Sequence, residues 1–247
     1  MHRKVILAGL AVAGVIASTA ETPAQPRAVL ELFTSQGCSS CPPADKLLGE
    51  YVARDDILAL SFNIDYWDYL GWKDTLASHE FSERQKAYSE ARGDRQVYTP
   101  QIVVNGGEHV VGSNRTALDA AVSRAEASGL PVPIALTSTD DAVHVNIGAA
   151  TDPTQTKGTA WLVMYEPTVT VPIARGENRG ETITYHNVVK KLRPIAMWKG
   201  EAMSVDLPKS EMSQAKVGRC AVLLQTEKHK GLPGMVLGAA ALPPETR

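Results

Sequence analysis

Hydrophobic residues follow two different patterns along the chain. Up to about residue 128, nearly continuous apolar runs alternate with stretches in which apolar side chains recur every three or four positions. Short continuous runs predict buried strands, and the three-to-four spacing predicts helices. Beyond residue 130 the helical spacing stops, and short alternating runs rich in β-branched residues follow. We therefore predict an α+β protein with two domains, at 28–130 and 131–247.

The first domain is predicted to have the order β-α-β-α-β-β-α. Two buried strands joined by a helix imply parallel pairing and a right-handed crossover. Asn105-Gly106 signals a hairpin turn. The predicted elements are the strands Ala28–Phe33 and Ile57–Ile64, the helices Ala44–Ala53, His79–Ala91 and Arg115–Ala127, and a strand after Pro100 that turns back over Glu108–Gly112.

The second domain is predicted to be all-β. Many short strands with turn signals between them favour a sandwich-like arrangement. The predicted strands are Ile134–Thr139, Ala142–Ala149, Thr159–Glu166, Val169–Ala174, Glu181–Lys190, Ile195–Trp198, Ser204–Leu207, Arg219–Gln225 and Met235–Ala240.

The N-terminus has the pattern of a secretory signal peptide. Residues 2–4 are basic, residues 5–17 are apolar but short for a membrane span, and residues 18–20 are small, as at a cleavage site. An uncleaved membrane anchor is the alternative. We predict that residues 1–20 are removed, that no membrane span remains, and that the mature protein is periplasmic or secreted.

Composition limits the classes of function. Of 247 residues, 44% are hydrophobic and 21% charged, which is typical of a globular protein. The net charge of −2 gives no electrostatic case for nucleic acid. Because no phosphate-binding glycine loop occurs, we predict no organic cofactor.

The most informative stretch is a C-x-x-C motif between a predicted strand and a predicted helix. Cys38 and Cys41 have this spacing, which lets the two sulfurs bond without unwinding the helix. A helix N-terminus favours a thiolate, which is the attacking species in disulfide exchange. We therefore predict that Cys38 is the nucleophile and Cys41 the resolving thiol.

Two prolines refine the position of the helix. Pro42 and Pro43 lack an N–H group, so they fit the first helical turn. We expect Ser40 to cap the helix, with Cys38 just outside it and more exposed than Cys41. A structural disulfide and half of a zinc site are the alternatives, although no second C-x-x-C or H-x-x-x-H completes a zinc site.

An aromatic loop, residues 65–74, follows the second predicted strand. The ends of parallel strands in a β-α-β unit open on one edge, so we expect Asp65 and Trp67 to lie near Cys38. Trp67, Tyr69 or Trp72 would then cover the thiols, and Asp65, if buried enough to have a raised pKa, would assist proton transfer to or from Cys41. A loop held by its own aromatic packing is the alternative.

The C-x-x-C motif and the Thr99-Pro100 pair before an apolar strand together resemble the thioredoxin superfamily. The resemblance implies that the Thr99–Pro100 bond is cis, that Pro100 packs beside the disulfide, and that Thr99 offers its backbone to an extended substrate. Ser39-Ser40 stands where thioredoxins proper have Gly-Pro, so the direction of electron flow stays open.

Four runs together resemble one bacterial secreted family, catalogued as domain of unknown function 1223. They are Leu30–Asp45, Asp65–Asp74, Tyr98–Gly106 and Ala174–Val189. The resemblance covers nearly the whole mature chain. It implies a thioredoxin-like domain with an added C-terminal β region, and it implies no particular reaction.

Within the β region, Arg179 and His186 are candidates for supporting residues. Arg175 and Arg179 lie in a glycine-rich charged turn, where arginines that reached Cys38 would lower the pKa of its thiol. A charged hairpin tip without chemistry explains the same composition. His186 would complete a copper or zinc site only if it lay within reach of both cysteines. Cys220, in an apolar run, is expected to be a buried free thiol.

We predict an exported thiol–disulfide oxidoreductase that exchanges disulfides with a protein or small-molecule thiol through Cys38 and Cys41. Its redox partner cannot be derived from the sequence. The alternatives are a periplasmic copper or zinc handling protein that uses the dithiol as ligands, and a binding module whose disulfide is only structural.

Overall fold

The structure, a computed structural model, describes residues 25–155, 157–210 and 218–243. The predicted signal peptide therefore lies outside the described residues. The elements are β1 (Ala28–Thr34), α1 (Pro42–Val52), β2 (Ile57–Asn63), α2 (His79–Arg92), β3 (Gln101–Val104), β4 (Glu108–Val111), α3 (Arg115–Ser128), β5 (Ile134–Ser138), β6 (Ala142–Ile147), β7 (Gly158–Pro172), β8 (Thr182–Trp198), β9 (Met203–Pro208), β10 (Arg219–Glu227) and β11 (Pro233–Ala241), with short 3-10 turns at Asp68–Leu70 and His229–Gly231.

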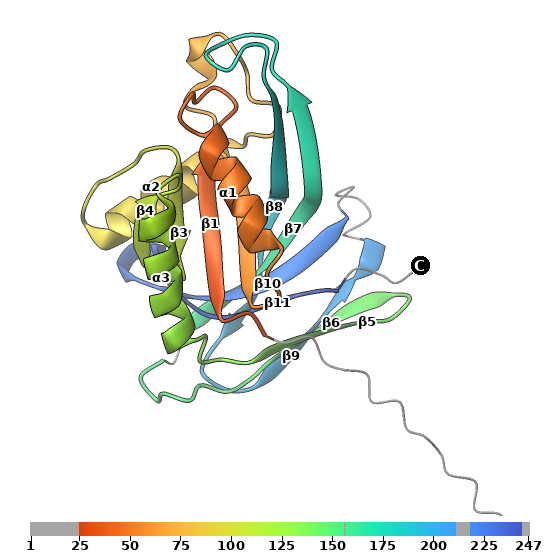
Figure 1. The fold of residues 1–247 in the computed structure, drawn as a ribbon. Helices are drawn as coiled ribbons and strands as arrows, with labels where there is room; N and C mark the ends of the chain where they lie inside the picture. Colours follow the sequence, from red (N-terminus) through yellow and green to blue (C-terminus); the bar gives the residue numbers. More distant parts are fainter. Residues whose placement is uncertain (1–24, 156, 211–217, 244–247) are drawn as a thin grey trace, which may run out of the picture.

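One mixed sheet runs through the molecule in the order β11-β10-β7-β8-β2-β1-β3-β4 (Figure 1). β1 and β2 are parallel, as predicted, and β2 also pairs in parallel with β8 through Ser61 and Val188. The sheet thus joins strands from both sides of the predicted boundary at residue 130. The prediction of a mixed helix-and-sheet protein is confirmed, and its division into two domains stays a prediction.

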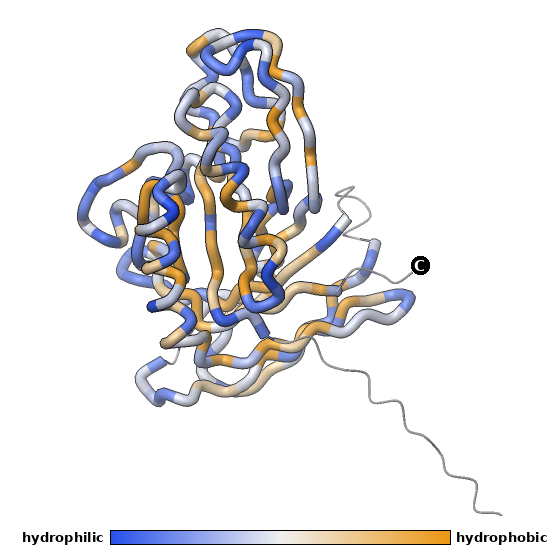
Figure 2. The backbone as a smooth tube through the Cα atoms, in the orientation of Figure 1, coloured by the Kyte–Doolittle hydropathy of each residue, from blue (hydrophilic) through white to orange (hydrophobic). Residues whose placement is uncertain are grey.

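The alternation of side chains along β1 explains how the helices are placed. Leu30 and Leu32 face the core shared with α1 and α3, whereas Val29 and Phe33 face the core that contains Phe81 and other residues of α2. The middle strands are therefore covered on both faces, as expected for strands that read as continuous apolar runs. Figure 2 shows hydrophobic residues along these central strands and alternating colours along the helices.

A second sheet, with the order β5-β6-β9, packs against the far half of the large sheet. Its inward side chains, among them Val143 and Val145, meet Leu162 and Val222 of the large sheet in one buried cluster. The small sheet is antiparallel, and the layer it packs against is an extension of the large mixed sheet, so the separate sandwich-like domain stays a prediction. Among the described helices, none is both long and apolar enough to cross a membrane.

The hairpin of β7 and β8 is longer than predicted. The prediction of four short strands in this region is wrong, because two long strands form instead. The register of β8 shifts by one residue between the pairs Ala160–Ala196 and Trp161–Pro194, so Pro194 lies in a bulge. A bulge tolerates a residue that cannot donate to the ladder, and the strand therefore continues.

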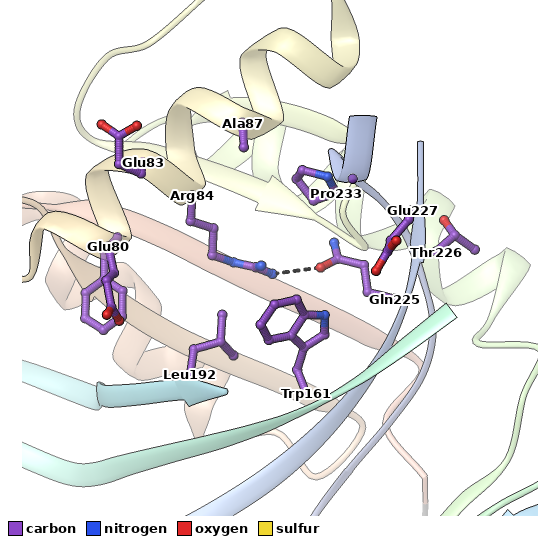
Figure 3. A pocket seen from close by; sticks show the side chains of 12 residues that line it. Glu80, Glu83, Arg84, Ala87, Trp161, Leu192, Gln225, Thr226, Glu227 and Pro233 are labelled. Atoms are coloured by element: carbon purple, nitrogen blue, oxygen red, sulfur yellow. Dashed lines mark hydrogen bonds between the residues drawn. The ribbon is translucent and has the colours of Figure 1, made fainter. Parts of the chain in front are cut away.

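α2 is fastened to the sheet by a buried ion pair. Arg84 Nε donates to Glu31 Oε2 at 2.7 Å, and its Nη2 donates to Glu31 Oε1, to Tyr88 Oη and to Gln225 Oε1. Figure 3 shows Arg84 reaching from the helix past Trp161 into a cavity of about 400 Å³. Since Glu31 is fully buried, the pair neutralises a charge that would otherwise be costly.

Candidate functional site

Cys38 and Cys41 form a disulfide at the start of α1. β1 ends at Thr34, and the chain turns through residues 35–40 before the helix begins at Pro42. The expected cap at Ser40 is wrong, because Cys41 itself occupies the cap position and its carbonyl accepts from the amide of Asp45 at 3.1 Å. Pro42 and Pro43 lie in the first turn, as predicted, where no hydrogen bond is lost.

The two cysteines differ little in exposure. Cys38 is 3% exposed and Cys41 fully buried, so the order is as predicted but Cys38 is far from open. The Cys38 sulfur lies 3.5 Å from the hydroxyl oxygen of Ser40. A hydroxyl at this distance can donate to a thiolate on Cys38 once the disulfide is reduced.

The Thr99–Pro100 bond is cis, as the resemblance implied. Trp67 links this bond to the disulfide loop. Its indole Nε1–H donates to Thr99 Oγ1 at 2.7 Å, and a Cβ added to Gly37 would lie 3.1 Å from Trp67 Cβ. Trp67 therefore packs close to Gly37, the residue before Cys38, and its covering of the thiols stays a prediction.

Asp65 does not have the predicted role. Its carboxylate accepts from the Ser82 hydroxyl and lies 3.0 Å from His79 Nδ1, on the α2 side of the loop. Partial burial opposes ionisation, but the hydrogen bonds from Ser82 and His79 together hold the pKa of Asp65 below its ordinary value. A proton acceptor with a raised pKa is therefore not supplied by Asp65.

Asp45 has the property that was expected of Asp65. It lies one helical turn after Cys41, on the same side of α1, and is 1% exposed. Burial, with a contribution from the charge of Asp74, raises its pKa to about 8, although the nearby Thr34 hydroxyl acts in the opposite direction. Sequence reasoning missed this residue, yet a carboxyl at a core-facing helix position four residues after Cys41 is a signal that could have found it.

The surroundings of Asp45 are polar and unsatisfied. Neither of its carboxyl oxygens has a hydrogen-bond partner among the described residues, and the same holds for the hydroxyl oxygens of Thr34 and Tyr185. Tyr185 comes from β8, and its pKa is raised by burial and by the nearby carboxylates of Asp45 and Asp74. Such a group of buried polar atoms is the kind of place that holds internal water.

The loop between β7 and β8 reaches the disulfide loop through residues that were not predicted. Figure 1 shows this loop beside the segment that precedes α1. Asn178 Nδ2 donates to the carbonyl oxygens of Gln36 at 2.9 Å and of Cys38 at 3.0 Å, and Glu177 Oε2 accepts from the amide of Ser39 at 3.3 Å. The turn was expected to act through its arginines, and instead an amide and a carboxylate make the contacts.

Arg179 and His186 stay apart from these contacts. The Arg179 side chain is exposed, and no hydrogen bond or ion pair joins it to residues 35–41 within the described chain. His186 packs against α1, where a Cβ added to Gly49 would lie 2.7 Å from its Nε2. Among the described residues, no group of three or more His, Cys, Asp or Glu side chains is arranged to hold a metal.

Cys220 lies in β10 and is a buried free thiol, as predicted. Burial raises its pKa to about 11, so it stays protonated and unreactive at neutral pH. It belongs to the cluster between the two sheets, together with Met164 and Val222.

Comparison with known proteins identifies relatives whose function is not described. The family model "Protein of unknown function (DUF1223)" matches residues 29–225. The crystal structure of protein AGR_C_4864 from Agrobacterium tumefaciens is 39% identical, with a TM-score of 0.80 over 91% of this chain and 97% of that chain. HBP35 of Porphyromonas gingivalis has a TM-score of 0.64 over 92% of this chain and 77% of that chain, and at 10% identity this likeness concerns the fold alone. No curated protein matches the chain.

Proposed function

The chain belongs to the DUF1223 family, and from the geometry of its site we propose that it is an exported, thioredoxin-like thiol–disulfide oxidoreductase. One observation supports the proposal above the others. The disulfide of Cys38 and Cys41 lies at the N-terminus of α1, and a buried carboxyl with a raised pKa, Asp45, lies one turn behind it. A structural disulfide needs no such carboxyl, whose burial is costly to the fold.

The proposed exchange has two steps. In the reduced protein the Cys38 thiolate attacks one sulfur of a substrate disulfide, which forms a mixed disulfide and releases the other substrate sulfur as a thiol. Cys41 then transfers its proton to the Asp45 carboxylate and attacks the Cys38 sulfur. This step re-forms the disulfide between Cys38 and Cys41 and releases the second substrate thiol. Two electrons pass from the protein to the substrate, and the reverse sequence oxidises a dithiol.

Asp45 suits the second step because of its pKa. A general base is most effective when its pKa lies near the working pH, and the pKa of about 8 for Asp45 satisfies this condition. Cys38 receives different support, since the positive end of the α1 dipole stabilises its thiolate. The two cysteines therefore have separate acid–base environments, one for attack and one for resolution.

We propose that the substrate is an extended polypeptide that crosses Trp67 and the Thr99–Pro100 bond. Tyr69 is 76% exposed and stacks on Trp67, with ring centroids 6.2 Å apart. The pair forms an aromatic surface beside Thr99, to which Trp67 is hydrogen-bonded. Aromatic surfaces of this kind contribute strongly to recognition of apolar side chains. We also propose that the protein acts in the periplasm or outside the cell, where disulfides persist.

The first test is the trapping of a mixed disulfide. In a Cys41→Ser variant, Cys38 is expected to form a stable mixed disulfide with a peptide disulfide, because the resolving thiol is absent. Mass spectrometry would detect the adduct, and the Cys38→Ser variant should form none. The reduction potential of the intact pair should lie at roughly −120 to −270 mV.

The opposite result would identify a structural disulfide. Absence of a trapped adduct, together with a potential below about −300 mV, would overturn the proposal. Reduction would then be expected to destabilise the fold by about 2–4 kcal/mol without any exchange activity.

A further inference from the structure

The tip of the β7–β8 hairpin holds the backbone on both sides of Cys38. Asn178 is 6% exposed, and its side-chain amide donates to the carbonyl oxygens of Gln36 and Cys38 at 2.9 and 3.0 Å. Both protons of this amide are thus used on the disulfide loop. Asn178 and Cys38 are 140 positions apart in the chain, so this contact ties the hairpin tip to the disulfide loop. A movement of the tip away from Cys38 would break these hydrogen bonds.

Glu177 adds a charge to this contact. Its Oε2 accepts from the amide of Ser39, the residue directly after Cys38, at 3.3 Å. Amides of this loop and of the first helical turn are the groups that stabilise a thiolate on Cys38. A carboxylate bound to one of them competes with the thiolate for the amide, and it also repels the thiolate charge.

We propose that Glu177 is a positioning residue through which the β7–β8 hairpin destabilises the Cys38 thiolate, so that the pair is a weaker oxidant than the disulfide loop alone would be. This inference rests on the proposed oxidoreductase function. A thiolate that is less stable makes the reduced state less favourable, and a pair with an unstable reduced state is a weaker oxidant.

Other charged groups around Cys38 are placed differently. Asp74 accepts a hydrogen bond from the Gln36 amide, and burial raises its pKa above the ordinary value. Asp45 is buried one helical turn after Cys41, and its pKa is raised to about 8 by burial. The remaining charged residues on the packed segments are Lys46 and Glu50 of α1, Asp65, Asp68 and Lys73 of the aromatic loop, and Arg175, Arg179 and Glu181 of the hairpin tip.

The test is the Glu177→Gln variant, which keeps an oxygen that can accept from Ser39 and removes the charge. In a Cys41→Ser background, the rate of iodoacetamide alkylation against pH reports the pKa of Cys38. We expect this pKa to fall by about half a unit, or about threefold in the thiolate, as is usual for one exposed charge. In the intact pair, the equilibrium with glutathione should shift up to about threefold toward the dithiol, or roughly 14 mV.

Glu181→Gln is the matched control, because it removes an exposed carboxylate from the same hairpin without altering a hydrogen bond to residues 35–41. The proposal is overturned if the Cys38 pKa is unchanged in Glu177→Gln, or if Glu181→Gln shifts it equally. An Asn178→Ala variant, which frees the tip, should lower the Cys38 pKa as Glu177→Gln does. These pKa measurements need no substrate, so they stay informative even if no mixed disulfide is trapped and the oxidoreductase function fails.

Discussion

The Asp45→Asn variant is expected to be more stable than the natural protein at pH 7, by up to about 4 kcal/mol, and to lose this advantage near pH 4. The unfolded chain releases the Asp45 proton near its ordinary pKa of 3.8, whereas the folded protein releases it at about 8. Between these values the folded state binds one proton more, so its stability falls as the pH rises. Each unit of pKa corresponds to about 1.4 kcal/mol, and asparagine avoids this loss because it does not ionise.

Urea unfolding of both proteins at pH 4, 5.5 and 7 measures the effect. The difference in the free energy of unfolding should grow with pH, and a difference that is constant with pH would contradict the prediction. Asp55→Asn is a suitable control, since Asp55 is exposed.

The activity of Asp45→Asn should fall while its stability rises, because Cys41 loses its proton acceptor. We expect mixed disulfides to accumulate in Asp45→Asn, as they do in Cys41→Ser but to a smaller extent.

The Arg84→Met variant is expected to lose about 3–5 kcal/mol of stability. Methionine fills much of the space of the arginine side chain, but it leaves the Glu31 carboxylate buried and without its positive partner. The hydrogen bonds from Arg84 to Tyr88 and Gln225 are lost as well. Thermal or urea unfolding would measure the change.

Two further variants separate charge from packing. Adding Glu31→Gln to Arg84→Met should restore part of the stability, because the stranded charge is removed. Arg115→Met breaks the ion pair between Arg115 and Glu50, whose side chains are 55% and 53% exposed, and should change stability by less than about 1 kcal/mol. Equal losses in Arg84→Met and Arg115→Met would contradict the importance of burial.

The sequence predicted local features of the site better than distant ones. The strand, the C-x-x-C motif, the two prolines and the helix follow one another within residues 28–52, so their geometry depends on short-range rules. The parallel arrangement of β1 and β2 also fixes where the loop after β2 begins, and Trp67 of that loop lies close to Gly37. The raised pKa predicted for Asp65 was wrong. Its carboxylate is paired with Ser82 and His79 of α2, and the local sequence pattern does not indicate that this helix packs against the aromatic loop.

The contact of the hairpin tip could not be derived in the same way. The glycines and charged residues of the β7–β8 turn predict that a turn forms there. Which segment the turn contacts depends on how far the two strands extend. Those strands were predicted as four short ones, from which the position of the turn relative to Cys38 does not follow. The side chains that make the contact, Glu177 and Asn178, lie between Arg175 and Arg179, which were predicted to act on Cys38. Their role became visible only through the observed length of the hairpin.

The position of β8 in the large sheet has a consequence for the order in which the protein assembles. Asn187 donates to the carbonyl of Ala59 in β2, and β8 also supplies Tyr185 beside Asp45. During synthesis, which proceeds from the N-terminus, the chain therefore presents both cysteines long before β8 arrives. Until then the edge of β2 is unpaired and open to other chains. A truncated protein that ends at residue 130 would keep this edge permanently, and we expect it to aggregate rather than to form a minimal redox domain.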